Sequence, residues 1–100
     1  MKIINTPLLD AFLIEENRHE DDRGYFIETY NKKEFSSIGL NMDFVQDNHS
    51  MSSPHVLRGL HYQVEKPQGK LVRCMKGSIL DVIVDLRQSS PTFGQHHAVH

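Results

Sequence analysis

The alternation of apolar and polar positions predicts short β-strands over most of this 100-residue chain. An apolar cluster within residues 8–15 and an alternating aromatic run at residues 25–30 indicate the first two strands. Further strand-like runs follow at residues 44–51, 56–64, 70–75, 78–86 and from about Gln95 onward. Turn residues separate these runs and no helical period intervenes, so the pattern favours an all-β antiparallel sandwich or barrel.

Three features depart from this regular series of predicted strands. Asn31 is a suitable N-cap for one short helix, residues 32–38, which Gly39 would end. The charged run of residues 15–23 is expected to end the first strand and to pass into a solvated turn. The chain stops at His100 inside a predicted strand, so we expect an incomplete sheet whose open edge is covered by another chain or by further residues.

Residues 78–86 show the clearest alternation, with large apolar side chains on both faces of the predicted strand. This pattern predicts a strand that is packed on both sides for most of its length. Asp85 and Arg87 lie two residues apart and therefore share a face. We interpret them as a structural ion pair rather than as catalytic groups.

Composition is that of one ordinary globular domain spanning residues 1–100, with 38% apolar residues, 24% charged residues and a formal charge of -2. This charge balance gives no support to a nucleic-acid partner or a polybasic membrane surface. No apolar run approaches the ~20 residues that span a bilayer, and no signal-like segment follows Met1. With Cys74 as the single cysteine, interpreted as a buried structural thiol, a cytoplasmic location is expected.

Polar side chains concentrate on three of the predicted strands. Residues 56–64 carry Arg58 and His61, residues 44–51 carry Gln46 and Asn48 on one face, and Lys70 begins a third strand. Buried polar groups need partners, and a ligand would supply them. We therefore expect these segments to line one pocket in which His61 moves a proton, although a strand histidine is more often a structural residue.

Arg58 and His61 point to opposite faces of a regular strand, so a shared ligand requires an irregular backbone, and Gly59 is the obvious place for it. The sequence has no Gly-rich phosphate loop, which leaves Arg23 and Arg58 as candidates for an anionic ligand. A metal is not expected at His61, because Gln63 occupies the second position of a His-x-His pair. A cupin-like metal protein that uses His96 and His100 remains an alternative.

Six segments together resemble the dTDP-4-dehydrorhamnose 3,5-epimerase family, and they occur in order over nearly the whole chain. They are Asp22 to Glu28 (DRGYFIE), Phe44 to Ser50 (FVQDNHS), Leu57 to Gln63 (LRGLHYQ), Lys70 to Val72 (KLV), and Asp81 to Arg87 (DVIVDLR) with Ser90 to Gly94 (SPTFG). The resemblance implies a cupin-type jelly roll that works as a homodimer with shared sites and without metal or other cofactor. It implies inversion of C3 and C5 of dTDP-4-dehydro-6-deoxyglucose to give dTDP-4-dehydrorhamnose, in rhamnose and polysaccharide biosynthesis.

The same resemblance implies roles for individual residues. His61 would be the base and Lys70 an active-site lysine that stabilises the oxyanion. The residues that it places against the nucleotide sugar are Arg23, Phe26, Glu28, Gln46, Asn48 and Arg58. Members of the family are close to twice this length, and the proton-donating tyrosine and the acid that orients the base lie in the half that is absent from this sequence. A truncated, non-catalytic half-domain that binds sugar nucleotides is therefore a second hypothesis.

Overall fold

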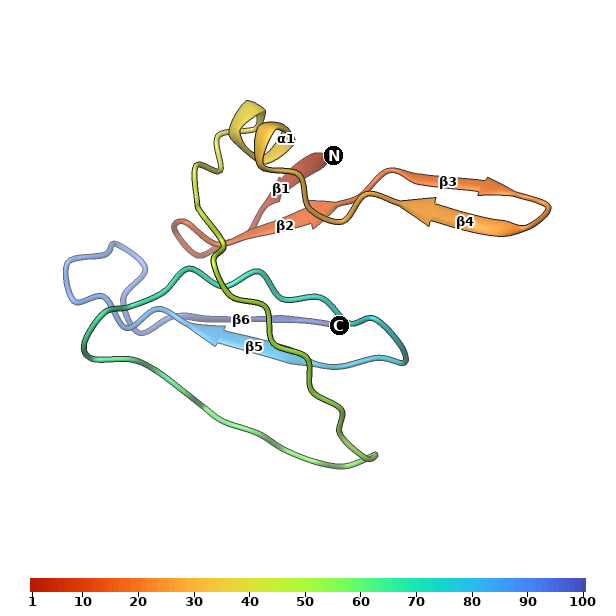
Figure 1. Cartoon of the computed structure of the whole chain (residues 1–100). Coiled ribbons are helices and arrows are strands. Elements are labelled where there is room, and N and C mark those ends of the chain that lie inside the picture. The colour runs from red at the N-terminus through yellow and green to blue at the C-terminus, as the bar shows by residue number, and fades with distance from the viewer.

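The structure, a computed structural model, describes all residues from Met1 to His100 and contains three separate two-stranded antiparallel sheets and one helix (Figure 1). The sheets pair strands that are neighbours in the chain order of regular elements, β1 with β2, β3 with β4 and β5 with β6. Most of the regular structure is therefore strand, and the all-β prediction is confirmed. The one helix spans six residues, and no helix has the length and apolar character needed to cross a membrane.

Strands β1 (Lys2–Asn5) and β2 (Phe12–Glu15) form the first hairpin, with Ile3 opposite Ile14. The Thr6 hydroxyl donates to the Ala11 carbonyl at 2.7 Å and so closes the turn between them. The first strand was not predicted from the sequence, because its only apolar pair, Ile3 and Ile4, is too short to show a period. The predicted strand at residues 8–15 is confirmed only over its second half.

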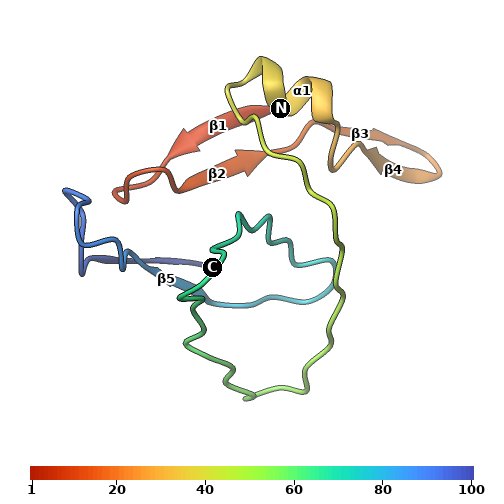
Figure 2. The same ribbon diagram turned by 60° about the vertical axis from the view of Figure 1, so that its left-hand side comes forward.

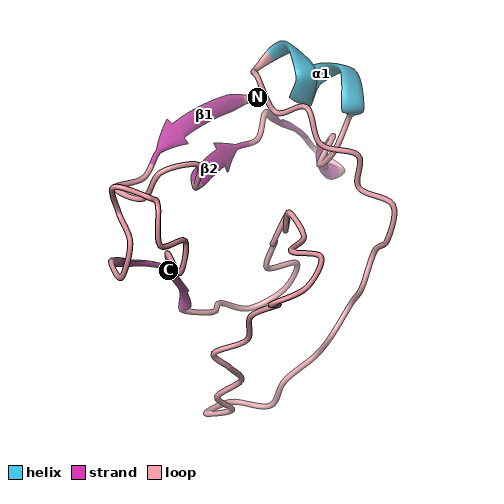
Figure 3. Ribbon diagram, turned by 90° about the vertical axis from the view of Figure 1, so that its left-hand side faces the viewer, coloured by secondary structure: helices cyan, strands magenta, loops and turns pink.

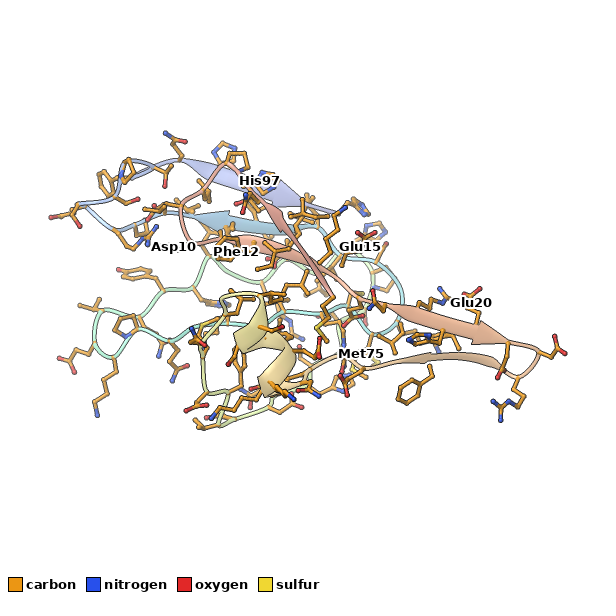
Figure 4. All side chains as sticks on the ribbon, turned by 90° about the horizontal axis from the view of Figure 1, so that it is seen from above. Asp10, Phe12, Glu15, Glu20, Met75 and His97 are labelled. Atoms are coloured by element: carbon orange, nitrogen blue, oxygen red, sulfur yellow. The ribbon has the colours of Figure 1, made fainter.

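Strands β3 (Arg18–Asp21) and β4 (Gly24–Ile27) form an arm that projects away from the rest of the molecule (Figure 1). Seen from above, Glu20 lies far out along this arm, away from Asp10 and Phe12 (Figure 4). The prediction that residues 15–23 hold no strand was wrong. Both faces of the arm are solvated, so β3 needs no apolar residues, and the Arg18 guanidinium lies 4.1 Å from the Tyr25 ring centre across the pair.

Helix α1 (Lys32–Ser37) confirms the one predicted helix, which begins at the predicted residue and ends one residue earlier than predicted. The Asn31 side chain accepts hydrogen bonds from the backbone N–H groups of Lys33 and Glu34. At the other end Gly39 has φ +88°, and the Gly39 and Leu40 N–H groups donate to the carbonyls of Ser36 and Phe35 in a Schellman motif.

A small aromatic cluster holds α1 against the chain on either side of it. Phe35 is 1% exposed, and its ring lies edge-on to Tyr30 and Phe44 with centroid distances of 4.8 and 6.3 Å. The only other buried apolar residues are Leu8 and Leu40. The hydrophobic core of this chain is therefore small, with Phe35 and Leu40 at the helix and Leu8 in the β1–β2 turn.

Strands β5 (Asp81–Val84) and β6 (His96–Val99) form the last hairpin, which lies below the first in the view of Figure 1. They confirm the centre of the strand predicted at residues 78–86 and the one predicted from Gln95. The expectation that residues 78–86 are packed on both sides was wrong, since Val82 and Ile83 are each 37% exposed and Leu80 is 64% exposed. The apolar side chains on both faces of this strand are thus only partly covered.

A polar clamp joins the β5–β6 turn to the β1–β2 turn. Arg87 donates to Asp85 in two bonds of 2.9 Å, to Asp10 at 2.7 Å and to the Leu9 carbonyl at 2.8 Å. The Thr92 hydroxyl donates to Asp85 and accepts from the Leu9 N–H. The predicted structural ion pair of Asp85 with Arg87 is thus confirmed, and Asp85 is the only buried charged residue.

Residues 41–80, which we call the open segment, contain no helix or strand. They run from α1 to β5 as a wide meander, plain in the rotated view of Figure 2 and as the long pink stretch of Figure 3. The strands predicted at residues 44–51, 56–64 and 70–75 are therefore wrong for this chain. Their residue types suit a sheet, but a strand needs a hydrogen-bonded neighbour, and no backbone hydrogen bond is made within residues 41–80.

Candidate functional site

The predicted site residues fall into two groups that lie on different parts of the fold. Arg23, Phe26 and Glu28 belong to the β3–β4 arm and the residue just after it, whereas the others lie on the open segment. All are exposed, and no hydrogen bond or ion pair connects the two groups. The structure therefore does not bring the whole predicted set into one pocket.

Two shallow hollows follow the arm and share its residues. Arg23 and Phe26 line one at the tip of the hairpin, together with Tyr25. Phe26 and Glu28 line the other, which reaches Glu34 of α1. His19 lines both hollows, a position that the sequence did not indicate because the charged run around it was expected to be a loop.

Arg23 already has a carboxylate partner. Its guanidinium donates to both oxygens of Asp21, and its backbone N–H donates to Asp21 as well. These bonds lower the pKa of Asp21 and raise the pKa of Arg23. An anionic ligand at Arg23 would have to compete with Asp21. The two-residue spacing of Asp21 and Arg23 across the turn could have suggested this ion pair.

Gln46 and Asn48 lie side by side, as their spacing predicted. The Gln46 amide nitrogen donates to the Asn48 side-chain oxygen at 3.1 Å. Arg58 donates to the Met51 carbonyl at 2.9 Å and so links the two extended stretches on either side of the turn at Pro54 and His55. Arg58 forms no ion pair with any carboxylate, and its guanidinium keeps other N–H groups for a ligand.

The backbone beside His61 is irregular at the expected place. Gly59 has φ +107°, a conformation that side chains rarely adopt, and a Cβ at Gly59 would lie 3.7 Å from the His61 Nδ1. His61 makes no hydrogen bond within the chain, and it lines neither hollow of the arm. Its ring is thus open to solvent and has no acid to orient it.

The Lys70 side chain contacts a residue of its own stretch of the chain. Its Nζ donates to the Gln68 side chain at 2.7 Å and contacts no carboxylate. Just before it, the Gly69 backbone passes so close to the Met42 sulfur that a Cβ there would lie 2.6 Å from it. The stretch that carries Lys70 therefore packs against the start of the open segment.

The histidine-rich end does not assemble a ligand set. His96 begins β6, opposite Val84, and His100 follows the last residue of that strand. Nowhere in the chain do three histidine, cysteine or carboxylate side chains gather closely enough to hold a metal ion. Cys74, expected to be buried, is exposed.

Taken chemically, the open segment displays an imidazole, an ammonium and an unpaired guanidinium, each free of a carboxylate partner. Such groups suit the binding of an anionic ligand and the removal of a proton next to a carbonyl. Among the predicted site residues, the one aromatic ring, Phe26, and the one carboxylate, Glu28, stand on the arm or just after it instead.

Comparisons with known proteins agree on one family. The sequence model for dTDP-4-dehydrorhamnose 3,5-epimerase matches residues 5–100. The chain is 55% identical over 94 residues to the epimerase of that name from Methanothermobacter thermautotrophicus and 52% identical over 97 residues to that from Shigella flexneri. These alignments cover 94% and 95% of this chain but 51% and 54% of the relatives, so the chain spans about half of their length.

Solved structures give the same result for the backbone. The crystal structure of dTDP-4-dehydrorhamnose 3,5-epimerase from Elizabethkingia anophelis matches 99% of this chain with a TM-score of 0.90 and 53% identity, over 55% of its own length. That from Bacillus anthracis, with TDP and PPi bound, matches 98% with a TM-score of 0.92, over 57% of its length. The backbone is accordingly that of about half of a cupin-like epimerase, and the chain belongs to the dTDP-4-dehydrorhamnose 3,5-epimerase family.

Proposed function

We propose that this chain carries the base-bearing half of an epimerase that inverts C3 and C5 of dTDP-4-dehydro-6-deoxyglucose, giving dTDP-4-dehydrorhamnose. The observation that carries the proposal is the 55% identity over 94 residues to an epimerase of that name, together with residues 57–63 at the centre of the open segment. The pathway served would be rhamnose and polysaccharide biosynthesis in the cytoplasm.

The chemistry follows from the position of the keto group. C3 and C5 both adjoin C4, so removal of either proton gives an enolate, and a neutral imidazole is a suitable base near pH 7. His61 is assigned as this base, and the Lys70 ammonium would stabilise the developing oxyanion. Arg58, with no carboxylate partner, is assigned to the diphosphate, because a guanidinium matches phosphate oxygens in pairs.

The remaining assigned residues complete the binding surface. Gln46 and Asn48 share one face beside Arg58, while Arg23, Phe26 and Glu28 stand on the projecting arm. The arm's isolation supports a homodimer in which the arm of one subunit completes the site of its partner. Equilibrium sedimentation tests the dimer, and a chain that stays monomeric at all concentrations would remove it from the proposal.

The decisive experiment is exchange of solvent deuterium into the 4-keto sugar nucleotide. A base alone can remove and return a proton on one face, so the chain should exchange deuterium at C3 or C5 even where inversion is slow. His61→Ala should slow this exchange by about 100-fold or more, with nucleotide affinity nearly unchanged. The matched control is His55→Asn, since His55 is exposed at φ +67° and asparagine tolerates that conformation.

Arg58→Ala should show the opposite pattern. Loss of a charge-assisted contact to phosphate is expected to weaken nucleotide-sugar binding by roughly 10- to 100-fold, with less effect on exchange at saturation. Arg58→Lys keeps the charge without the paired geometry and should recover only part of the affinity. Equal affinities for all three proteins, measured by calorimetry, would show that Arg58 is misassigned.

The second candidate is a binding module without catalysis. It is favoured by the exposure of His61, whose ring is oriented by no carboxylate of this chain. Nucleotide-sugar binding with no deuterium exchange would establish that function and exclude the first.

A further inference from the structure

Gly69 differs from the other five glycines of the chain. Each of the other five has a positive φ, a backbone conformation that favours glycine, whereas Gly69 does not. A side chain at residue 69 is excluded by space instead, because a Cβ there would lie 2.6 Å from the Met42 sulfur. Non-bonded heavy atoms meet at about 3.5–4.0 Å. The Met42 side chain therefore lies directly against the Gly69 backbone.

Met42 itself is held from both sides along the chain. Two residues before it, the Leu40 N–H donates to the Phe35 carbonyl at 2.8 Å, and Leu40 is buried at the end of α1. Two residues after it, Phe44 packs edge-on against Tyr30 with a centroid distance of 5.4 Å. The position of Met42, whose side chain is 39% exposed, is therefore set by the aromatic cluster beside the helix.

The opposite side of residues 68–70 carries the lysine. The Lys70 ammonium donates to the Gln68 side chain at 2.7 Å, so these two side chains lie on one side of the chain. Neighbouring residues of an extended chain face opposite sides, and Gly69 meets Met42 on the other side. Met42 thus stands behind the stretch from which the Lys70 side chain projects.

Few other contacts locate this stretch. No backbone hydrogen bond is made within residues 41–80, and the nearest ion pair along the chain joins Arg73 to Glu16 at 3.8 Å. A partly exposed pair at this distance contributes little. The packing of Met42 on Gly69 is therefore the contact that ties the backbone next to Lys70 to the aromatic cluster.

We propose that Met42 is a positioning residue for Lys70, because its packing against Gly69 fixes the backbone from which the ammonium reaches the substrate. The inference rests on the proposed function, in which this ammonium stabilises an oxyanion. Such stabilisation requires a donor about 2.7–3.1 Å from the oxygen that becomes charged. A small displacement of the backbone should therefore lower the rate of proton removal without abolishing nucleotide binding.

Nuclear magnetic resonance tests the contact and its effect on Lys70 without any substrate. The Met42 methyl carbon lies 3.8 Å from the position of a Gly69 Cβ, so a nuclear Overhauser effect is expected between this methyl group and a Gly69 α-proton. Gly69→Ala should displace residues 68–70 and shift the Lys70 Cε and Hε signals. Adding Met42→Ala makes room for the new methyl group and should reverse most of that shift, the non-additivity expected of residues in contact.

Met75→Ala is the matched control, because it removes the same side chain at a 64% exposed position and should leave the Lys70 signals in place. Absence of the Overhauser effect would overturn the proposal. So would Lys70 signals that Gly69→Ala leaves unchanged, or a double variant that is no closer to the unaltered chain than Gly69→Ala alone.

Deuterium exchange into the 4-keto sugar nucleotide measures the consequence for the reaction. Gly69→Ala should lower the exchange rate at saturation about tenfold while nucleotide affinity changes less than about twofold, and the double variant should recover to within about threefold of the unaltered chain. An exchange rate that Gly69→Ala leaves unaffected would overturn the proposal. An unaltered chain that exchanges no deuterium would refute the proposed function alone, and the Lys70 signals would then decide whether Met42 positions that side chain.

Discussion

Asp85 is the one charged residue of this chain that is buried. The Arg87 guanidinium, followed by the Ser90 and Thr92 hydroxyls, holds the pKa of Asp85 far below its ordinary value of 3.8. A carboxyl with a lowered folded-state pKa contributes stability that is complete above its unfolded value and is lost as the pH falls toward the folded value. We therefore predict that the chain loses stability steadily below about pH 4.

Asp85→Asn tests the origin of this dependence. The amide keeps the size of the side chain but cannot accept charge-assisted bonds from Arg87, so the variant should be less stable at pH 7 and flatter in its acid dependence. Urea unfolding at pH 3 and pH 7 measures both effects. Asp47→Asn, on an exposed residue without a salt bridge, serves as the control and should keep the original acid dependence.

Side-chain contacts between residues close together in the chain could be predicted from the sequence. Asp85 with Arg87, and Gln46 with Asn48, each lie two residues apart and make the contact that this spacing allows. The partner of Arg23 has the same spacing, but the hairpin that brings Asp21 to it was not expected. No hydrogen bond or ion pair joins Phe26 or Glu28 to His61 or Lys70 within the chain, and the order of residues along the sequence does not indicate this separation.

At the scale of elements, α1 should be sensitive to its N-cap. Asn31 satisfies two N–H groups of the first turn, and its replacement by alanine should lower the free energy of unfolding by about 1 kcal/mol. Lys33→Ala is the matched control, because Lys33 is exposed in the same turn and alanine favours helix. A loss of equal size in both variants, measured by urea unfolding, would contradict the capping role.

The helix and the strands differ in how far the sequence determines them. Helix α1 is set by Asn31 and Gly39, which flank it closely, so its ends could be predicted to within one residue. The runs at residues 44–51 and 56–64 have the residue types of strands, but their pairing depends on distant partners. Strand β3 shows the converse, since pairing with β4 makes a strand of four charged or polar residues.

The molecule as a whole is more open than its length requires. Its Cα radius of gyration is 15.3 Å, whereas a compact domain of 100 residues has a radius of about 13 Å. The whole chain has only three buried apolar residues, so each contributes a large share of the packing. The stability of the free chain should accordingly depend on very few side chains.

Phe35 is the strongest test of this dependence, because it is the one side chain that is almost wholly buried. Phe35→Ala removes the ring that Tyr30 and Phe44 pack against and should cost about 3–5 kcal/mol. A small domain has only about 5–15 kcal/mol in total, and a chain this open lies at the lower end, so the variant should be largely unfolded at 25 °C. Phe93→Ala removes the same ring at a 52% exposed position and should change stability by less than about 0.5 kcal/mol. Circular dichroism and tyrosine fluorescence distinguish the two variants, and a folded Phe35→Ala protein would show that the stability of the chain resides outside the aromatic cluster.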